Sequence, residues 1–363
     1  MYKFLISGGG TGGHIFPAVS IADALRTAMP DCEILFVGAE NRMEMERVPQ
    51  AGYKIVGLPI KGFDRSNLLR NIPILFDLLK SLWKARKIVR DFRPDVGIGV
   101  GGYASGAAMK VAAWQNVPIL LQEQNGFAGV TNKLLRNNAS KICVAYEGME
   151  RFFPKDKIIL TGNPVRQTLL NGNREEALKH FGFSADKPVL LVIGGSLGAR
   201  TINNAIGNNL DNLLNAGIQV LWQTGKVYFA DAQKTAEPFK CPELIVTDFV
   251  SRMDLAYSMA DLVISRAGAS SISEICLLGK AAILVPSPNV AEDHQTHKAM
   301  ALVNKDAALM VKDSDAATML VEEAIRLVND KPRLEKLRSN ALGLAQNDSA
   351  KRIAEEVIKL IKH

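Results

Sequence analysis

A glycine-rich loop that ends in a histidine is the stretch of this 363-residue chain best suited to chemistry. Ser7 to His14 reads SGGGTGGH and directly follows the apolar run Tyr2 to Ile6. Glycines let a backbone turn tightly and approach a ligand, and Pro17 predicts the first turn of a helix just after the loop. A strand, a glycine loop and a helix start leave unpaired N–H groups at a positive helix end. The loop therefore predicts a site for an anion or a developing negative charge, beside a histidine that titrates near neutral pH.

Similar loops recur later in the chain. Gly194 to Ser196 and Gly268 to Ser273 each follow an apolar run, and the second opens a helix that carries Glu274. Successive N–H groups and hydroxyls at a helix start suit a diphosphate, and the Glu274 carboxylate suits a vicinal diol, although a favourable helix dipole explains Glu274 as well. Arg166 and Arg200 adjoin glycine-containing loops, so they are candidates for neutralising phosphates or ordinary surface charges.

Strand and helix patterns alternate along the chain and indicate how these loops are positioned. Strands are expected at residues 2–6, 33–37, 95–100, 118–122, 141–145, 158–160, 188–193, 219–223, 244–246, 262–264 and 282–285. The alternation predicts an α/β protein with parallel sheets covered on both faces, and ligands bind at the carboxyl ends of such strands. Loops at 101–103 and 123–125 also emerge there.

The length of the chain favours two domains. Because the glycine loop recurs, we expect two Rossmann-like domains facing a cleft. Residues 1–162 would form the N-terminal, acceptor-side domain, joined by the C-terminal helix of residues 345–363. Residues 163–344 would form the C-terminal domain.

Charge and composition narrow the classes of partner. Lys and Arg exceed Asp and Glu by 44 − 37, or +7, which suits a nucleotide or an acidic membrane surface. The sequence contains no basic array interleaved with aromatic residues, so it does not indicate nucleic-acid binding. The four scattered cysteines indicate reduced thiols. We expect no signal peptide and no membrane span, and hence a cytoplasmic protein unless it docks on a surface. His294 and His297 lack a metal-binding pattern, and helix capping explains Asp313 to Asp315, so no metal site is predicted.

An amphipathic helix is expected over Ile72 to Phe92. Its predicted core positions are Leu75, Leu78, Leu79, Leu82, Val89 and Phe92. Its apolar sector is widened by Ile72, Phe76 and Trp83 and flanked by Lys80, Lys84, Lys87 and Arg90. A wide apolar face with basic edges suits an anionic membrane surface, and a buried helix with snorkelling lysines fits the pattern equally.

Alternative functions remain open on the residues alone. Gly8, Gly10 and Gly13 formally match G-x-G-x-x-G, and Glu40 follows the second strand, which is the pattern of an NAD-dependent oxidoreductase. The later glycine loops argue against that class. Two further functions are possible alternatives. One is a non-catalytic, membrane-docked protein that binds a sugar nucleotide, and the other is a UDP-sugar epimerase.

Several motifs, in order along nearly the whole chain, carry a resemblance to a known family. They are residues 8–14, 101–103, 123–125, 162–166, 194–196, 266–268, 273–274 and 294–296. With them the chain resembles the MurG family of bacterial peptidoglycan glycosyltransferases, which add N-acetylglucosamine (GlcNAc) to lipid I to give lipid II. The resemblance implies a GT-B fold, UDP-GlcNAc held mainly by the second domain, and lipid I held by the first at the cytoplasmic face of the membrane. It implies no cofactor, and it adds cell-wall synthesis proteins as possible partners.

The resemblance also implies roles for particular residues. His14 would be the base that deprotonates the muramyl 4-hydroxyl in a single inverting displacement. Glu274 would bind the ribose hydroxyls, Gln295 the GlcNAc hydroxyls, and Val250 the uracil. The other donor-binding positions are Thr11, Gly12, Gly13, Asn125, Arg166, Ser196, Gly268, Ala269, Ser270, Ser271, Ile272 and Ser273. Acceptor and membrane positions are Gly101, Gly102, Tyr103, Ile72, Phe76, Lys80, Trp83, Lys84 and Lys87. Lys298 stands where the family usually has Asn.

Overall fold

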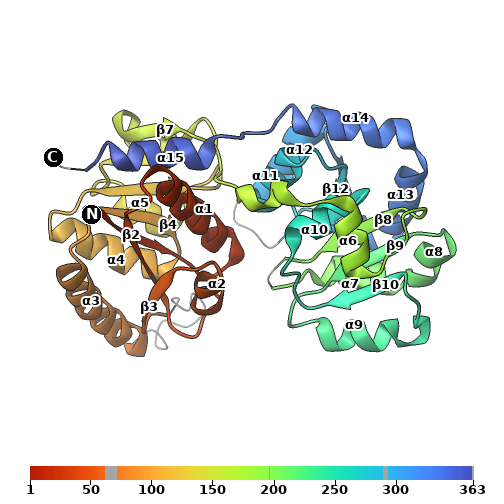
Figure 1. Ribbon diagram of the computed structural model, residues 1–363, viewed down its shortest axis with the longest axis horizontal. Coiled ribbons are helices and arrows are strands. Elements are labelled where there is room, and N and C mark those ends of the chain that lie inside the picture. The colour runs from red at the N-terminus through yellow and green to blue at the C-terminus, as the bar shows by residue number, and fades with distance from the viewer. Residues whose placement is uncertain (62–71, 196, 289–292, 362–363) are drawn as a thin grey trace. The chain divides into compact units, whose positions relative to one another are not determined.

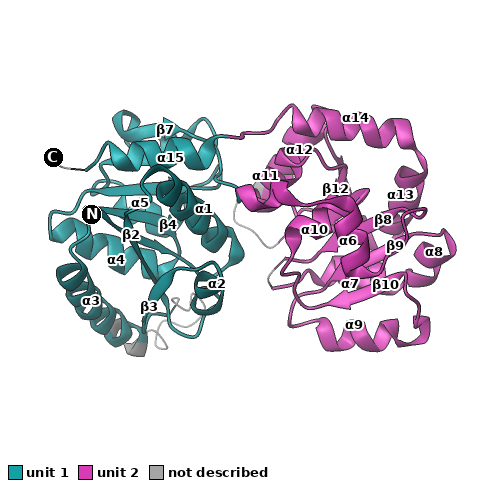
Figure 2. Cartoon of the chain, in the orientation of Figure 1, with its two compact units in different colours: residues 1–166, 348–363 teal, residues 167–347 magenta. Residues whose placement is uncertain are grey.

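The structure is a computed structural model, and it describes residues 1–61, 72–195, 197–288 and 293–361, without the side chains of Ile72, Pro73, Leu75 and His294 (Figure 1). The chain forms two compact units (Figure 2). Unit 1 comprises Met1–Arg166 and Asp348–His363, and unit 2 comprises Gln167–Asn347. Each unit has the predicted α/β architecture, a parallel sheet flanked by helices.

Unit 1 contains a seven-stranded parallel sheet with the order β3-β2-β1-β4-β5-β6-β7. Its strands are β1 Lys3–Gly8, β2 Glu33–Ala39, β3 Lys54–Leu58, β4 Val96–Gly101, β5 Ile119–Glu123, β6 Lys141–Val144 and β7 Ile158–Leu160. Its helices are α1 Gly12–Ala28, α2 Glu44–Gln50, α3 Ile72–Phe92, α4 Tyr103–Trp114, α5 Val130–Leu135 and α15 Ser349–Ile358. The central strands are buried along their whole length, as expected when helices cover both faces.

Alternation of side chains along β1 divides the core of unit 1 into two layers. Phe4 and Ile6 pack in one layer with residues of α1 and with Ile353 of α15. Leu5 points to the other face, where α3, α4 and α5 cover the sheet. The C-terminal helix therefore completes the first sheet's core, far in sequence from the strands it covers.

Unit 2 contains a six-stranded parallel sheet with the order β10-β9-β8-β11-β12-β13. Its strands are β8 Val189–Ile193, β9 Gln219–Gln223, β10 Leu244–Thr247, β11 Leu262–Ser265, β12 Ala282–Leu284 and β13 Leu309–Met310. Its helices are α6 Arg174–Phe181, α7 Arg200–Gly207, α8 Leu210–Asn215, α9 Phe229–Ala236, α10 Met253–Met259, α11 Ala269–Leu277, α12 His294–Val303, α13 Ala316–Asn329 and α14 Lys331–Leu342.

Several short elements were not predicted from the sequence, among them α2 and β13. Helix α2 is seven residues long and contains Pro49, so it presents no apolar periodicity. Strand β13 is two residues long.

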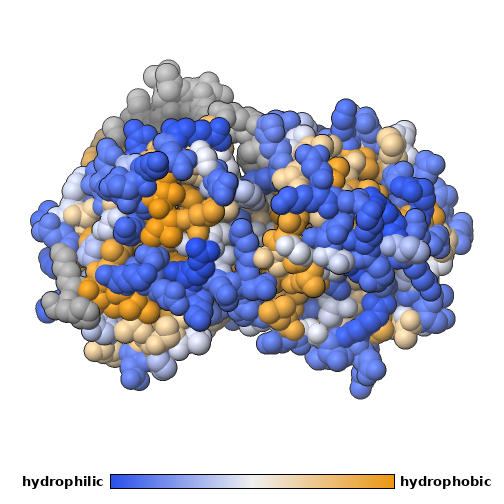
Figure 3. All heavy atoms as spheres, turned by 90° about the horizontal axis from the view of Figure 1, so that it is seen from above, coloured by the Kyte–Doolittle hydropathy of each residue, from blue (hydrophilic) through white to orange (hydrophobic). Residues whose placement is uncertain are grey.

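The face of the molecule shown in Figure 3 is mainly hydrophilic, and its hydrophobic residues lie in separate patches. Within the described ranges, no helix combines the length and apolar character needed to cross a bilayer.

Candidate active site

Three loops of unit 1 meet because β1, β4 and β5 are neighbours in the sheet and all run in the same direction. The N–H of Gly9, after β1, donates to the carbonyl of Gly101, at the end of β4, over 3.3 Å. Gly102 has φ +90°, and a Cβ there would lie 2.6 Å from the carbonyl oxygen of Gly9. Glycine is therefore required at Gly102 both by its backbone conformation and by the closeness of the two loops.

His14 lies in the first turn of α1 with its ring against these loops. Its Nδ1 is 3.1 Å from the carbonyl oxygen of Gly9 and 3.4 Å from Oγ1 of Thr11, the N-cap residue. Because a carbonyl only accepts, Nδ1 carries the proton in this bond, which leaves the lone pair of Nε2 available. Nε2 borders Gly101, where an added Cβ would come within 2.9 Å. The arrangement leaves one ring nitrogen able to accept a proton.

Burial and charge act on His14 in opposite directions. Burial lowers its pKa from the ordinary value, while the carboxylates of Glu123 and Glu44 and the bond to Gly9 raise it. Burial is the largest of these effects, so the pKa is lowered overall. A neutral imidazole at physiological pH is the form that a general base needs.

Glu44, at the start of α2, is a site residue that the sequence analysis missed. It is fully buried, and its two carboxylate oxygens accept from the N–H of Gly10 over 2.9 Å and the N–H of Ala39 over 3.0 Å. It lies against Gly9, where a Cβ would overlap the carboxylate. The acidic first turn of α2, Glu44 with Glu46, was the available signal.

Glu123, at the end of β5, shapes the third loop. It is buried, and its carboxylate accepts from the N–H groups of Asn125 and Gly129 over 3.1 and 2.9 Å. The side-chain amides of Asn125 and Asn132 add bonds of 3.4 and 2.9 Å. The predicted donor contact Asn125 is thus held in place by an internal carboxylate.

The remaining donor-binding residues predicted for unit 1 lie near the start of α1. Gly12 and Gly13 form its first turn, and Gly13 is exposed. The guanidinium of Arg166 lies 4.1 Å from the centre of the ring of Phe16, a residue of α1. Arg166 and the glycine loop are therefore brought to the same helix end, as a phosphate-binding role requires.

The first glycine loop of unit 2 is tied to neighbouring strand ends. The side-chain amide of Gln223, at the end of β9, donates to the carbonyls of Gly195 and Asp248 over 3.1 and 2.9 Å. Val250 follows in the same region and is buried. Gln223 was not among the predicted site residues, although it stands at a strand end. Ser196 lies outside the described residues.

Helix α11 begins directly after Gly268, so the N–H groups of Ala269, Ser270 and Ser271 occupy its first turn. The hydroxyl of Ser270 is buried and has no hydrogen-bond partner among the described residues. Ser273 bonds back to the carbonyl of Ala269 over 3.0 Å, and the Ile272 side chain is buried. The backbone and Ser270 thus have the donors that an anion needs.

Two further predicted donor-binding residues already have hydrogen-bond partners in unit 2. Glu274 is 8% exposed, and one of its oxygens accepts from the hydroxyl of buried Tyr257 over 3.0 Å. Gln295 accepts from the N–H of Ser287 over 2.9 Å through its side-chain oxygen. Lys298, the departure from the family pattern, is buried. The amide group of Gln295 keeps its N–H donors for other partners.

Two acidic residues form ion pairs in place of the roles expected for them from the sequence. The Glu40 carboxylate, which completes the pattern of an NAD-dependent oxidoreductase, lies 2.8 Å from Nζ of Lys84. Asp313 does not cap the helix that follows, and the side chain of Asp315, the N-cap residue of α13, forms no capping bond. Asp313 instead accepts from Arg266 and from the Thr201 hydroxyl. That pair holds the strand-end loop from which α11 starts.

The outer sides of α3 and α4 form what we call the α3–α4 surface, consisting of Phe76, Leu79, Trp83, Trp114, Lys80, Arg86 and Lys87. Phe76, Leu79 and Trp83 are 61%, 57% and 72% exposed. The predicted core position of Leu79 is therefore wrong. The apolar sector is wide enough to reach both the sheet and the outside, and Leu79 lies on the side away from the sheet.

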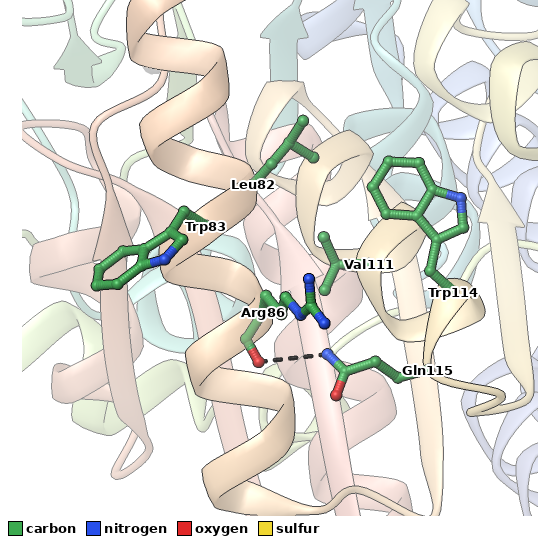
Figure 4. A pocket seen from close by; sticks show the side chains of 6 residues that line it. All are labelled: Leu82, Trp83, Arg86, Val111, Trp114 and Gln115. Carbon is green, nitrogen blue, oxygen red and sulfur yellow. Dashed lines mark hydrogen bonds between the residues drawn. The ribbon is translucent and has the colours of Figure 1, made fainter.

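A pocket of about 410 Å³ opens in this surface. It is lined by Leu82, Trp83, Arg86, Val111, Trp114 and Gln115. Figure 4 shows the two indoles on either side of the pocket, one from each helix, and the bond of 3.3 Å from the side-chain amide of Gln115 to the carbonyl of Arg86. Tyr103, at the start of α4, is also exposed. Trp114 was not among the predicted site residues, because it ends a helix whose other residues are mostly small.

Sequence comparisons identify related proteins over the full chain. Residues 4–144 match the glycosyltransferase family 28 N-terminal domain, and residues 189–357 match its C-terminal domain. A UDP-N-acetylglucosamine–N-acetylmuramyl-(pentapeptide) pyrophosphoryl-undecaprenol N-acetylglucosamine transferase of Parabacteroides distasonis is 60% identical, covering 99% of this chain and 98% of that protein. The protein of the same name from Phocaeicola vulgatus is also 60% identical, with 99% and 96% covered.

Solved structures agree with these matches. MurG of Acinetobacter baumannii has a TM-score of 0.71 and 27% identity, with 99% of each chain covered. A UDP-N-acetylglucosamine 2-epimerase has a TM-score of 0.69 at 12% identity, covering 99% of this chain and 96% of that one. The second likeness concerns the fold alone.

Proposed function

The chain belongs to glycosyltransferase family 28, and we propose that it transfers GlcNAc from UDP-GlcNAc to the lipid-linked muramyl-pentapeptide lipid I, giving lipid II for peptidoglycan synthesis. The relatives that share 60% of its residues over 99% of its length carry the name of this reaction. That identity, extending through both units, is the observation on which the proposal depends. An NAD-dependent oxidoreductase is set aside, because Glu40 forms an ion pair and the glycine loops belong to a glycosyltransferase.

His14 acts as the general base in this proposal. Its Nε2 accepts the proton of the muramyl 4-hydroxyl while that oxygen attacks the anomeric carbon of GlcNAc and the bond to UDP breaks, with inversion. Support comes from the proton on Nδ1, which points Nε2 away from the Gly9 carbonyl, and from the burial that keeps the ring neutral. Gly101, Gly102 and Tyr103 are proposed to line the acceptor side of this loop cluster.

Unit 2 binds the donor in this proposal. The first turn of α11 and the unpartnered Ser270 hydroxyl take the diphosphate, and Glu274 takes the ribose hydroxyls with its remaining acceptor capacity. Gln295 reaches the GlcNAc hydroxyls, and Val250 borders the uracil. The N–H groups at the start of α11 stabilise the leaving diphosphate, with no cofactor invoked.

The α3–α4 surface is proposed to hold the protein on the anionic cytoplasmic face of the cell membrane, where lipid I resides. Exposed Phe76, Leu79 and Trp83 would enter the interface, and Lys80 and Lys87 would contact acidic headgroups. Lys84 is less available, because it pairs with Glu40. Contact with cell-wall synthesis proteins is a further proposal that rests on the family alone.

A transfer assay tests the function. Purified protein incubated with UDP-GlcNAc and a soluble lipid I analogue should form the disaccharide product, detected by mass spectrometry. Without acceptor, no free epimerised sugar should appear, and titration with NADH should give no binding. Absence of product together with tight NADH binding would overturn the proposal, and binding of UDP-GlcNAc without transfer would favour a non-catalytic sugar-nucleotide-binding protein.

A further inference from the structure

We propose that Glu44 is a positioning residue for His14 and acts through the single peptide group that joins Gly9 to Gly10. The N–H of this peptide group donates to Oε2 of Glu44 over 2.9 Å. Its carbonyl accepts from Nδ1 of His14 over 3.1 Å. Carboxylate, peptide and imidazole thus form one continuous chain of hydrogen bonds. The inference rests on the proposed role of His14 as the base.

The order of these bonds gives the relay its effect. A carboxylate that accepts from the Gly10 N–H polarises the peptide group and increases the negative charge on the Gly9 carbonyl oxygen. That oxygen becomes a better acceptor for the Nδ1 proton, so the tautomer with a free Nε2 is favoured. When Nε2 takes a proton, the same chain stabilises the imidazolium. In a serine-protease triad a carboxylate does this by bonding the histidine directly; here a peptide group lies between them.

Glu44 is also held in the place that the relay requires. It is fully buried, and its other oxygen is anchored by the N–H of Ala39 at the end of β2. Among the described residues, no lysine or arginine forms an ion pair with it. Two N–H bonds therefore hold a buried carboxylate whose charge is not neutralised by a cation, so the charge acts on the groups beside it.

The glycine at position 9 supports the same arrangement. A Cβ on Gly9 would overlap the Glu44 carboxylate, so the absence of a side chain lets the acid reach the peptide group. The peptide is held from other sides as well, because the Gly9 N–H donates to Gly101 over 3.3 Å. The loop is thereby fixed with the Gly9 carbonyl directed at the histidine.

The tautomer of His14 in the full-length wild-type protein is the first test. In ¹⁵N-detected histidine spectra near neutral pH, with the His14 signals assigned by their loss in His14→Gln, Nδ1 should be protonated and Nε2 unprotonated. A wild-type ring protonated at Nε2 would overturn the relay. This measurement needs no Glu44 variant, so it remains decisive if such variants fold poorly.

Glu44→Gln is the second test. Glutamine keeps the size of the side chain but removes the charge, and its amide cannot accept from both N–H groups. We expect kcat to fall by roughly 10-fold, part of the about 100- to 10,000-fold that a general base supplies, with little change in KM for UDP-GlcNAc. The His14 ring signals should shift toward a mixture of tautomers.

The pH profile separates positioning from simple support of the fold. The charged groups that face His14 are Glu123 from β5 and Glu44 from α2, and both raise its pKa. Removing the Glu44 charge should lower the pKa, so the acidic limb of the kcat/KM profile should move to lower pH. Glu46→Gln, an exposed change on the same helix, is the matched control and should leave kcat, ring signals and profile unchanged.

The outcomes distinguish this inference from the proposed function. Unchanged ring signals and an unmoved profile in a folded Glu44→Gln protein would overturn the relay even if transfer is slower. Full turnover in His14→Ala would instead overturn the role of His14 as base, and with it the catalytic use of the relay. The ring signals would still report whether Glu44 sets the tautomer, because they do not depend on transfer.

Discussion

His14 is a residue at which burial and charge compete. Burial lowers its pKa, and the carboxylates of Glu123 and Glu44 keep it from falling further. The combination suits a base that must be neutral before the reaction and stable as a cation during it. Both carboxylates come from elements other than α1, so the protonation of this one ring depends on three separate parts of unit 1.

Replacing His14 by alanine should separate catalysis from donor binding. We expect His14→Ala to lower kcat by roughly 100-fold or more, the scale of general-base catalysis, while the Kd for UDP-GlcNAc measured by calorimetry stays nearly unchanged. His180→Ala, which removes an exposed histidine in α6, is the matched control and should retain full turnover. Equal losses of turnover and donor affinity in His14→Ala would contradict the base assignment.

The same residue sets a pH dependence. The neutral ring accepts the proton, so activity is lost as pH falls through the pKa of His14. Because burial lowers that pKa, the acidic limb of the wild-type kcat/KM profile should lie below the usual range for histidine. A limb at or above that range, in a buffer series at constant ionic strength, would be inconsistent with a lowered pKa for this partly buried ring.

At the scale of elements, α3 presents different residues on its two sides. Val89 and Ala85 pack on the sheet, whereas Phe76 and Trp83 are exposed on the opposite side. Large apolar groups exposed next to one another and beside lysines form a patch of the kind that marks interaction surfaces. Together with Trp114 of α4, this side has the chemistry of a surface that meets a membrane interface.

Charge reversal on α3 tests this surface. Lys80→Glu/Lys87→Glu should weaken binding to phosphatidylglycerol vesicles by at least roughly 10-fold, since each basic residue near an anionic surface contributes about 1 kcal/mol. Lys84 is left unchanged because its reversal would place two acids side by side. Sedimentation with vesicles at low salt measures the effect.

A control with the same change of charge makes that test specific. Lys234→Glu/Lys331→Glu reverses two exposed lysines of unit 2 and should bind vesicles like the wild type. Equal binding by both double variants and the wild type would mean that the α3–α4 surface does not contact lipid.

At the scale of the whole molecule, the two units are expected to respond differently to the donor. Ligand present at 100 times its Kd stabilises the unit that binds it by about 2.7 kcal/mol. We expect UDP-GlcNAc to slow hydrogen exchange in the first turn of α11 and around Gly195, with little change in the interior of the unit 1 sheet. Peptide-resolved hydrogen–deuterium exchange on the full chain measures this.

Glu274→Gln provides the matching variant for the exchange experiment. It keeps a side chain that packs beside Tyr257 but weakens the acceptor proposed for the ribose, so protection at equal UDP-GlcNAc concentration should decrease. Protection confined to the loop of residues 9–13 in unit 1 would contradict donor binding by unit 2.

Much of the fold was predictable from local patterns. Apolar runs located nearly every strand of both sheets, because a strand buried on both faces has a continuous apolar sequence. The parallel arrangement followed from the helices between strands, and the convergence of His14, Gly101 and Glu123 followed from the direction of neighbouring strands. The family was identified by the order of the loop motifs, which the comparisons confirm.

The tertiary structure alone decided what depends on contacts between distant residues. Glu44 reaches Gly10 across 34 positions from a helix too short to show periodicity, and Tyr257 reaches Glu274 across 17. Whether Leu79 faces the sheet or the outside depends on how α3 is rotated on its neighbours. A sequence pattern reports local periodicity and backbone preference, whereas these hydrogen bonds and exposures arise only when separate elements pack together.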